Sequence, residues 1–451
     1  MNTPIVDFVK NYNSKKTLRL HMPGHKGESF LGCEPWDITE IDGADVLYKA
    51  EGIIKQSEDN TAKIFGTEKT VYSTEGSSLA IRAMLYLIKM YGNAKGEKPI
   101  IAAGRNAHKT FITAAALLDL EVEWLNPKTT DTVICCDITP RYLEEYLNNC
   151  RQKPLAVYVT SPDYLGNMLD ISALASVCKK NSVLLLVDNA HGAYLRFLPQ
   201  NLHPIALGAD MCCDSAHKTL PVITGGAYLH IGKNAPKFFS QQAENAMSVF
   251  ASTSPSYLIL QSMDIANKYI TDGFSEKLEV FIKEVEALKT ELTAFGYTLC
   301  GNEPLKLTIA TKDYGYTGEE FAGILEKEGI VCEFYDPDFT VMMLTENIGK
   351  KGLAILKNVL LGIKRKTKIT EQPPKPMTFK KRMSPNAALF ALSEELAVDE
   401  CCGRVLKSDA VTCPPAIPIV ICGEEITENA VKCFKYYGIK KCSVVIEENK
   451  T

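Results

Sequence analysis

Short apolar segments alternate with stretches of helical periodicity between about residue 70 and residue 235, and this alternation is the strongest constraint on the fold. The apolar segments are nearly continuous hydrophobic runs, which is typical of strands buried on both faces. The expected strands are residues 98–104, 154–162, 181–191, 208–216 and 226–231. Helical periodicity covers residues 77–92, 108–125, 140–149 and 171–181. The pattern predicts an α/β fold with a mainly parallel sheet covered by helices.

The rest of the chain changes pattern at recognisable points. A long helical stretch at 274–295 leads into a small α+β unit, and the Pro- and Lys-rich stretch 366–378 is typical of a linker. We therefore expect five segments. They are an N-terminal segment (1–70), a large domain (71–273), a small α+β domain (274–365), the linker (366–378) and a short C-terminal domain (379–451).

Composition and charge argue against several classes of partner. Charged residues make up 23% of the 451, the formal net charge is −4, and no basic stripe or tail is present, so we expect no nucleic-acid partner. No apolar stretch approaches the roughly 18 residues of a membrane span, and the N-terminus lacks the pattern of a signal peptide. We therefore expect no membrane association and a cytoplasmic location.

The 15 cysteines are scattered and show no CxxC spacing. This usage is typical of reduced thiols that are buried as small hydrophobic groups. We expect neither a disulfide framework nor a metal site.

Three of the expected strands are followed by polar clusters, which read TSPDY, DNAHG and DSAHK. In open α/β sheets, ligands bind beyond the carboxyl ends of the strands. We therefore expect these clusters to share one site, although three unrelated loops are the alternative.

Asp188 ends the most apolar of these strands, and Lys218 follows the next one. A carboxylate can keep a heterocyclic nitrogen protonated, and a lysine amine can form a Schiff base with an aldehyde. Together the two residues indicate a site for pyridoxal 5′-phosphate. Taken singly, Lys218 could be a solvated lysine and Asp188 a helix cap or an ion-pair partner.

The phosphate of this cofactor needs hydroxyls and backbone N–H groups at a helix N-terminus. The stretch YSTEGSSLAIRAML supplies such groups at Thr74, Gly76, Ser77 and Ser78. Next to the lysine, Ser215 and His217 can also reach the phosphate. His108 begins the helical stretch that follows the one at 77–92, and it could stack on the ring of the cofactor. We also expect the glycines after Lys218 to let the chain pass close to the cofactor.

Motifs along nearly the whole chain resemble the Orn/Lys/Arg decarboxylase family. LHMPGHKG (20–27) resembles the family's N-terminal signature, and CPPAIPIVICGEEIT (413–427) resembles its C-terminal signature. Between them, STEGSSLA, RNAHKT, TSPDYLGNMLDI, VDNAHGAYLRF and DSAHKTLPVITGGAYLHI follow the family order. The resemblance is to the short form of the family, without the extra N-terminal domain of its large members, so their ring assemblies are not expected.

The resemblance implies the aspartate-aminotransferase fold, with a large cofactor-binding domain built on a seven-stranded type of sheet. It implies that Lys218 anchors pyridoxal phosphate, that Asp188 pairs with its ring nitrogen, and that His108 and His191 lie against the ring. Ser77, Ser78, Ser215 and His217 match phosphate-binding positions. Thr253 is similar to a residue that reaches the phosphate from the neighbouring subunit, which implies a homodimer or a higher homo-oligomer.

The chain departs from the family pattern in two places. Asn189 stands where a glutamate is common, and the phosphate loop reads TEGSS instead of an Asn-Gly-Ser/Thr form. Neither change removes a group that the chemistry requires.

The distal end of a basic amino acid needs acidic partners. The candidates are Asp37, Glu40 and Asp45 in the N-terminal segment, and Glu424. Glu424 is favoured, because it lies in the C-terminal signature beside otherwise apolar residues. For each of the four, a surface acid is the alternative.

The resemblance implies decarboxylation of arginine, lysine or ornithine to the amine and CO2, in polyamine metabolism. The N-terminal segment would contribute to the active site, and residues 379–451 would be the C-terminal decarboxylase domain. Two alternatives stay open. One is another reaction of this fold, an aminotransferase or a lyase reaction. The other is a non-catalytic binding protein that keeps the fold.

Overall fold

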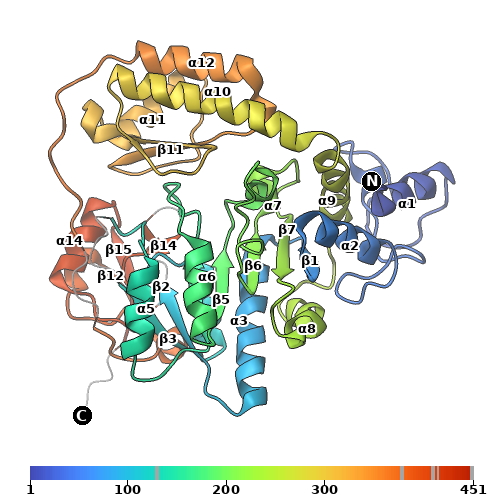
Figure 1. The fold of residues 1–451 in the computed structure, drawn as a ribbon, viewed down its shortest axis with the longest axis horizontal. Coiled ribbons are helices and arrows are strands. Elements are labelled where there is room, and N and C mark those ends of the chain that lie inside the picture. The colour runs from blue at the N-terminus through green and yellow to red at the C-terminus, as the bar shows by residue number, and fades with distance from the viewer. Residues whose placement is uncertain (127–131, 376–379, 408–411, 414–415, 447–451) are drawn as a thin grey trace. The chain divides into compact units, whose positions relative to one another are not determined.

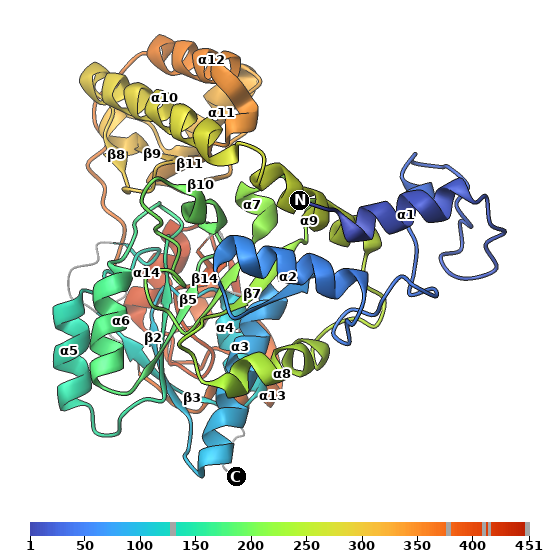
Figure 2. The same cartoon turned by 45° about the vertical axis from the view of Figure 1, so that its right-hand side comes forward.

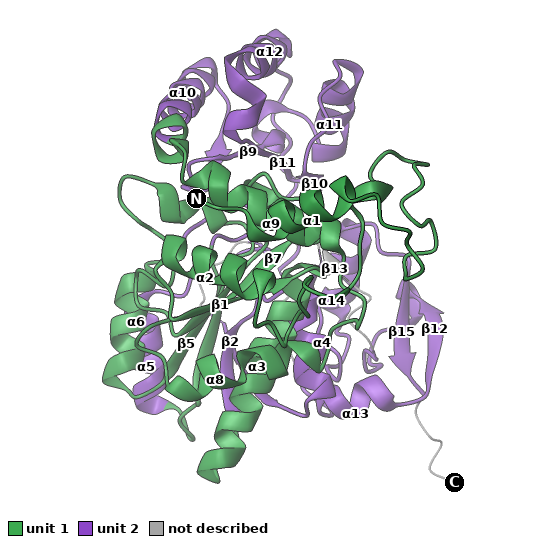
Figure 3. Cartoon of the chain, turned by 90° about the vertical axis from the view of Figure 1, so that its right-hand side faces the viewer, with its two compact units in different colours: residues 1–99, 150–161, 170–278 green, residues 100–149, 162–169, 279–451 purple. Residues whose placement is uncertain are grey.

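The structure is a computed structural model that describes residues 1–126, 132–375, 380–407, 412–413 and 416–446. Two compact units share the chain, and Figure 3 shows them in different colours. The first unit contains residues 1–99, 150–161 and 170–278, and the second contains 100–149, 162–169 and 279–451. The last part of the expected linker (376–378) and Pro414–Pro415 of the C-terminal signature lie outside the described residues.

The first unit is an α/β assembly whose elements are labelled in Figure 1. Its helices are α1 (Pro4–Ser14), α2 (Ile53–Phe65), α3 (Gly76–Lys95), α6 (Ile171–Lys180), α7 (Ala216–Thr219), α8 (Lys237–Ser248) and α9 (Tyr257–Ile270), with short 3-10 turns at Glu34–Trp36 and Ala193–Phe197. Its strands are β1 (Lys69–Ser73), β4 (Ala156–Thr160), β5 (Leu184–Asp188), β6 (Met211–Asp214) and β7 (Ala227–Ile231).

The strands of the first unit lie in the order β1-β7-β6-β5-β4. The ladders from β4 to β5 and from β5 to β6 are parallel, whereas β7 runs antiparallel to both of its neighbours. Parallel pairing places the last residues of β4, β5 and β6 at the same edge, because Thr160 is in register with Asp188 and Asp188 with Cys213. The polar clusters predicted to share a site therefore follow strands that end together.

The strands are as deeply buried as the sequence predicts. Leu185, Val187, Met211 and Leu229 are each at most 1% exposed. Helix α3 packs against β6 and β7 and presents Leu79 and several neighbouring apolar residues to the core. Covering helices exclude water from both faces of such a sheet, so its hydrophobic burial is the main contribution to stability.

The second unit contains a pair of parallel strands, a small antiparallel sheet and the C-terminal region. Its helices are α4 (Lys109–Leu117), α5 (Pro140–Asn149), most of α10 (Phe274–Phe295), α11 (Gly318–Lys327), α12 (Gly349–Gly362), α13 (Pro385–Phe390) and α14 (Glu428–Tyr436), with 3-10 turns at Thr311–Tyr314, Glu346–Ile348 and Val398–Glu400. Its strands are β2 (Ile100–Gly104), β3 (Glu121–Leu125), β8 (Leu299–Cys300), β9 (Lys306–Ala310), β10 (Phe334–Tyr335), β11 (Phe339–Met343), β12 (Ser393–Ala397), β13 (Thr412–Cys413), β14 (Ile417–Pro418) and β15 (Lys441–Val445).

Within this unit, β2 and β3 are parallel, and β10-β11-β9-β8 form an antiparallel sheet. Figures 1 and 2 show α10, α11 and α12 on one side of that sheet. Ion pairs from Lys350 to Glu284 and from Lys357 to Glu291 join α12 to α10. The C-terminal region packs a core around Leu406, Phe434 and Val444. The α/β expectation is confirmed, with five strands of the expected sheet in one unit and two in the other.

One expected element is wrong. The stretch 108–125 was predicted to be helical throughout, but α4 ends at Leu117 and Glu121–Leu125 form strand β3. Asp119 adopts a left-handed φ of 47°, which ends helical geometry, and the alternating EVEWL that follows suits a strand. Within the described ranges, no helix is both long and apolar enough to cross a membrane.

Candidate active site

Lys218 lies in the single turn of helix that follows strand β6. Ser215 leads into this turn, and its carbonyl accepts a hydrogen bond from the backbone N–H of Lys218 at 2.9 Å. The side-chain amine of Lys218 lies 3.0 Å from Nε2 of His191, which is 5% exposed. A short turn at the carboxyl edge of a buried sheet therefore holds an amine and an imidazole within hydrogen-bond distance of each other.

Asp188 is the last residue of β5 and is 2% exposed. Its Oδ2 accepts a hydrogen bond from the hydroxyl of Tyr158 at 3.0 Å, and its Oδ1 accepts one from the backbone N–H of Ala190 at 3.2 Å. Burial raises the pKa of Tyr158 well above its usual range, and the charge of Asp188 adds to the effect. Tyr158 therefore stays protonated and donates to the carboxylate.

Tyr158 is a site residue that the sequence did not single out. Its only signal is a polar aromatic side chain in the middle of the apolar segment PLAVYVTSP, two residues before Thr160, which is in register with Asp188. Alternation along a strand places positions 158 and 160 on the same face.

The predicted phosphate loop is assembled in the same unit. Helix α3 begins at Gly76, whose φ is +72°. Apart from its neighbours in the chain and the backbone of its own helix, a Cβ added to Gly76 would have no described heavy atom within 4 Å. The hydroxyl of Ser215 donates to that of Ser77 at 2.7 Å, which joins the lysine turn to the N-terminus of α3. Ser78 lies in the first turn of α3, and Thr74 is buried just before it. The N-terminus of this long helix, with hydroxyls beside it, is an arrangement that binds anions.

The glycines after Lys218 pack against this loop. The N–H of Gly76 donates to the carbonyl of Gly225 at 2.7 Å, and a Cβ on Gly225 would lie 2.9 Å from the carbonyl oxygen of Thr74. The φ of Gly225 is +102°, which only glycine adopts without strain. The close approach of this segment is thus to the phosphate loop itself. His217 is turned toward the same segment, since its Nδ1 lies 3.0 Å from the carbonyl oxygen of Gly226.

Thr253 is exposed and lies just before α9. Its neighbour Ser252 donates its backbone N–H to Oε1 of Glu75 at 2.8 Å. This segment therefore lies beside the N-terminus of α3 of its own chain.

Two predicted site residues belong to the second unit. His108 caps α4, because its Nδ1 accepts the backbone N–H of Thr110 at 3.2 Å. Glu424 accepts a hydrogen bond from Nη2 of Arg105 at 2.7 Å and another from the N–H of Ile421 at 2.8 Å. The side chains of Arg105 and Glu424 are 11% and 7% exposed. Glu424 is therefore committed to a buried ion pair, an arrangement that the sequence did not reveal.

The acidic candidates of the N-terminal segment differ in their surroundings. Asp45 accepts backbone N–H groups from Gly52 and Ile54 at the start of α2, and despite partial burial these and neighbouring donors hold its pKa below the usual range. Asp37 lies 3.3 Å from Nε2 of His25. Partial burial raises the pKa of Glu40. Asp45 thus acts as a helix cap.

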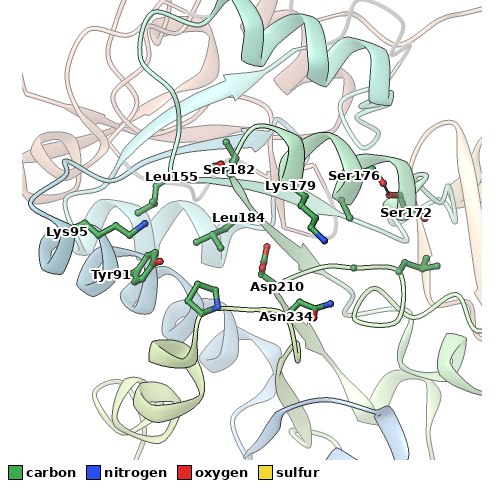
Figure 4. A pocket seen from close by; sticks show the side chains of 15 residues that line it. Tyr91, Lys95, Leu155, Ser172, Ser176, Lys179, Ser182, Leu184, Asp210 and Asn234 are labelled. Carbon is green, nitrogen blue, oxygen red and sulfur yellow. Dashed lines mark hydrogen bonds between the residues drawn. The ribbon is translucent and has the colours of Figure 1, made fainter.

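A cavity of about 390 Å³ in the first unit lies at the other edge of the sheet. Leu155, Leu184 and Asp210, which line it, stand at the starts of β4, β5 and β6 (Figure 4). Since Lys218 and Asp188 follow the carboxyl ends of these strands, this cavity is separate from the candidate site.

The residues at the carboxyl edge fit pyridoxal phosphate by their chemistry. A buried carboxylate, an amine and an anion-binding helix N-terminus lie in one unit, as the sequence predicts. The hydroxyls of Thr160 and Thr219 are buried and, among the described residues, have no hydrogen-bond partner. Buried polar atoms of this kind are normally satisfied, so polar groups of a ligand suit them.

Comparisons with known proteins identify the family to which the chain belongs. The family model described as Orn/Lys/Arg decarboxylase, major domain, matches residues 3–300, and that of the C-terminal domain matches residues 366–442. An arginine decarboxylase of Bacillus subtilis (strain 168) is 28% identical over 470 residues, which cover 95% of this chain and 92% of that protein.

Solved structures share the fold. The lysine decarboxylase of Francisella novicida superposes with a TM-score of 0.79 at 17% identity, covering 98% of this chain and 81% of that chain. A structure of SPT with PLP superposes with a TM-score of 0.55 at 13% identity, covering 70% of this chain and 79% of that chain. With both domain models matched in order along the sequence, this chain belongs to the Orn/Lys/Arg decarboxylase family.

Proposed function

We propose that this chain decarboxylates a basic amino acid (arginine, lysine or ornithine) with pyridoxal 5′-phosphate as cofactor, within polyamine metabolism. The observation that carries the proposal is the grouping of Lys218, Asp188 and the Ser77–Ser215 pair at one edge of the sheet. Family membership supports the same chemistry. When bound, the cofactor supplies an electron sink for the electrons left by the departing CO2.

The protein's own residues have separable roles in this proposal. Lys218 binds the cofactor's aldehyde, and Asp188 holds a proton on the ring nitrogen. Because Nε2 of His191 lies 3.0 Å from the amine of Lys218, the two can hold and exchange the proton that replaces the lost carboxylate. Ser77, Ser78, Ser215 and the N-terminus of α3 bind the phosphate. His108 stacking on the ring and a phosphate contact from Thr253 remain parts of the proposal.

The distal end of a basic substrate carries a positive charge and needs an acidic acceptor. The relative from Bacillus subtilis is named an arginine decarboxylase, which supports a basic substrate. Since Asp45 caps α2 and Glu424 pairs with Arg105, we favour Asp37 and Glu40 as the acceptors. Asp37 is half-buried beside His25 and Glu40 is exposed, so both carboxylates are accessible to a cation.

We also propose a homodimer or a higher homo-oligomer located in the cytoplasm. Leu18, Leu20, Phe30 and Leu31 in the N-terminal segment are each at least 79% exposed. Apolar side chains gathered in one segment are typical of a surface that another chain covers. Free thiols throughout the described residues, such as Cys178 and Cys401, fit a reducing compartment.

The test is to add pyridoxal phosphate to the purified chain, record its visible spectrum and follow CO2 release from arginine, lysine and ornithine. We expect the absorption band of a lysine-bound cofactor and CO2 from one substrate, with both lost in Lys218→Ala. A band without CO2 would indicate an aminotransferase or another lyase reaction. No band in the wild-type chain would indicate a binding protein.

A further inference from the structure

Three side chains with metal-binding atoms meet inside the first unit, away from the groups used above. They are His203, Asp214 and His230, and each side chain is 0% exposed. Although Asp214 directly precedes Ser215, none of the three is among the residues assigned to the candidate active site. Their ligand atoms all lie within 4.8 Å of one another. Fully buried ionisable groups are rare unless they are paired or bind a metal, so this cluster needs a physical account.

The topology of the sheet assembles the cluster. Cys212 and Asp214 lie on the same face of β6 because they are two residues apart. His230 on β7 is in register with Cys212, so it shares that face. His203 comes from the loop before β6. The sequence predicted no metal site because it lacks CxxC spacing, but these ligands are brought together by strand pairing.

The distances suit a small tetrahedral ion. Oδ2 of Asp214 lies 3.0 Å from Nε2 of His203 and 3.3 Å from Nε2 of His230. For bonds of about 2.0–2.1 Å to tetrahedral Zn²⁺, ligand atoms lie about 3.3 Å apart. The thiol of Cys212 is the nearest further ligand, since its Sγ lies 3.9 Å from Nε2 of His203 and 4.0 Å from Oδ1 of Asp214.

Outer partners orient two of the ligands. Nδ1 of His230 lies 2.8 Å from the hydroxyl of Thr70, and the amide of Asn189 donates to Oδ1 of Asp214 at 2.7 Å. Metal ligands are usually fixed by such contacts on their other polar atom. On its other side, Nε2 of His230 is buried and faces Oδ2 of Asp214 at 3.3 Å.

The aromatic ring of Phe65 packs against both histidines of the cluster. The ring of Phe65 lies 5.2 Å from the ring of His203 and 4.6 Å from that of His230, measured between centroids. Since all three side chains are 0% exposed, a bound ion would take its ligands from the protein, as structural zinc sites do.

We propose that His203, Asp214, His230 and Cys212 bind one Zn²⁺ as a structural site. Both imidazoles would bind through Nε2 as neutral ligands, with Nδ1–H of His230 donating to Thr70. Cys212 would release its thiol proton to solvent on binding. One carboxylate and one thiolate balance the charge of Zn²⁺, which a fully buried site requires. The ion would join β6, β7 and the loop of His203, at the end of β6 that leads into the turn carrying Lys218.

The first test is metal analysis of the whole chain, prepared without a histidine tag and without chelators, followed by zinc-edge X-ray absorption. We expect about one Zn²⁺ per chain, with two imidazoles and one sulfur near 2.3 Å among its neighbours. A folded chain that holds less than about a tenth of an equivalent of zinc, and gains none on refolding with added Zn²⁺, would overturn the proposal. So would zinc that has no imidazole neighbours. Zinc with imidazoles and no sulfur would remove Cys212 from the site and so overturn the four-ligand form.

Matched variants locate the ion. Asp214→Asn and His230→Asn should each lower the zinc content of the folded chain at least about tenfold. Cys178→Ser, in a buried thiol at the end of α6, should leave it unchanged. Lys218→Ala should also keep its zinc, which separates this proposal from the proposed activity. Zinc retained in Asp214→Asn contradicts the site. If Asp214→Asn does not fold, Cys212→Ser offers a milder change. Its X-ray absorption spectrum should lose the sulfur signal.

Discussion

Tyr158 and Asp188 lie on adjacent parallel strands, and the tyrosine hydroxyl donates to the buried carboxylate at 3.0 Å. Tyr158→Phe removes this donor and leaves the carboxylate short of a partner. We expect the free energy of unfolding to fall by about 1–3 kcal/mol, measured by urea denaturation. The affinity for pyridoxal phosphate should also fall, because the carboxylate would be less firmly held.

Tyr228→Phe is the matched control for that change. Tyr228 is equally buried in the same sheet, but its hydroxyl makes no hydrogen bond among the described residues. We expect its removal to be neutral or slightly stabilising. An equal loss of stability in both variants would mean that the bond to Asp188 contributes nothing specific.

His191→Gln should test the proton-holding role of the imidazole beside Lys218. The amide can still hydrogen-bond to the amine but cannot carry a proton at neutral pH. We expect kcat for CO2 release to fall by about 10²–10⁴, while the absorption band of the bound cofactor remains. An unchanged kcat over the pH range studied would remove His191 from the chemistry.

Gly225→Ala should disturb the phosphate loop. The new methyl group would lie 2.9 Å from the carbonyl oxygen of Thr74, at a φ of +102°. We expect a loss of roughly 1–3 kcal/mol in stability and a weaker affinity for pyridoxal phosphate, measured by fluorescence titration. Gly96 also has a positive φ, of +70°, but lies in open space, so Gly96→Ala should cost about 1–2 kcal/mol and leave cofactor affinity intact. Weakened binding in Gly96→Ala as well would point to general destabilisation.

Asp264 should make the stability of the first unit depend on pH. Burial raises its pKa to about 6, although it accepts hydrogen bonds from Ser57 and from the backbone of Ile5 and Val6. Between its ordinary value and about 6, the folded state binds more protons than the unfolded state. The free energy of unfolding attributable to Asp264 therefore falls as pH rises through this window, by on the order of 2–3 kcal/mol, and levels off above it.

Urea denaturation at several pH values measures this slope. Asp264→Asn should lack it, because the amide does not titrate. If the wild-type chain and the variant show the same change in unfolding free energy between pH 4 and pH 7, Asp264 is not its source.

The alternation of strands and helices was predictable because burial on two faces leaves a direct trace in the sequence. Expected strands 98–104 and 181–191 contain β2 and β5, and the expected helix 274–295 is α10. The positions of Lys218 and Asp188 at the carboxyl edge of the sheet were predictable, because Asp188 ends one apolar strand and Lys218 follows another. The strand 121–125 was missed because its acidic residues also fit helical periodicity, and the positive φ of Asp119 leaves no clear signal.

Pairings between distant segments account for most of what the sequence did not reveal. The ion pair of Glu424 with Arg105 joins residues more than 300 positions apart, and it gives an expected substrate ligand a buried partner within the protein. Asp45 also looked available in the sequence, but it caps a helix that begins eight positions later. The cluster of His203, Asp214 and His230 depends on the register between two strands. No local pattern marks any of these contacts.

The interleaving of the two units has a consequence for synthesis on the ribosome. The first unit needs residues up to 278, so it is complete only after the segment 100–149 has already left the exit tunnel. That segment belongs to the second unit, which cannot finish folding until residues 279–451 have been synthesised. During this interval helix α4 lacks its packing against α13, and apolar surface left uncovered in this way favours aggregation of a nascent chain.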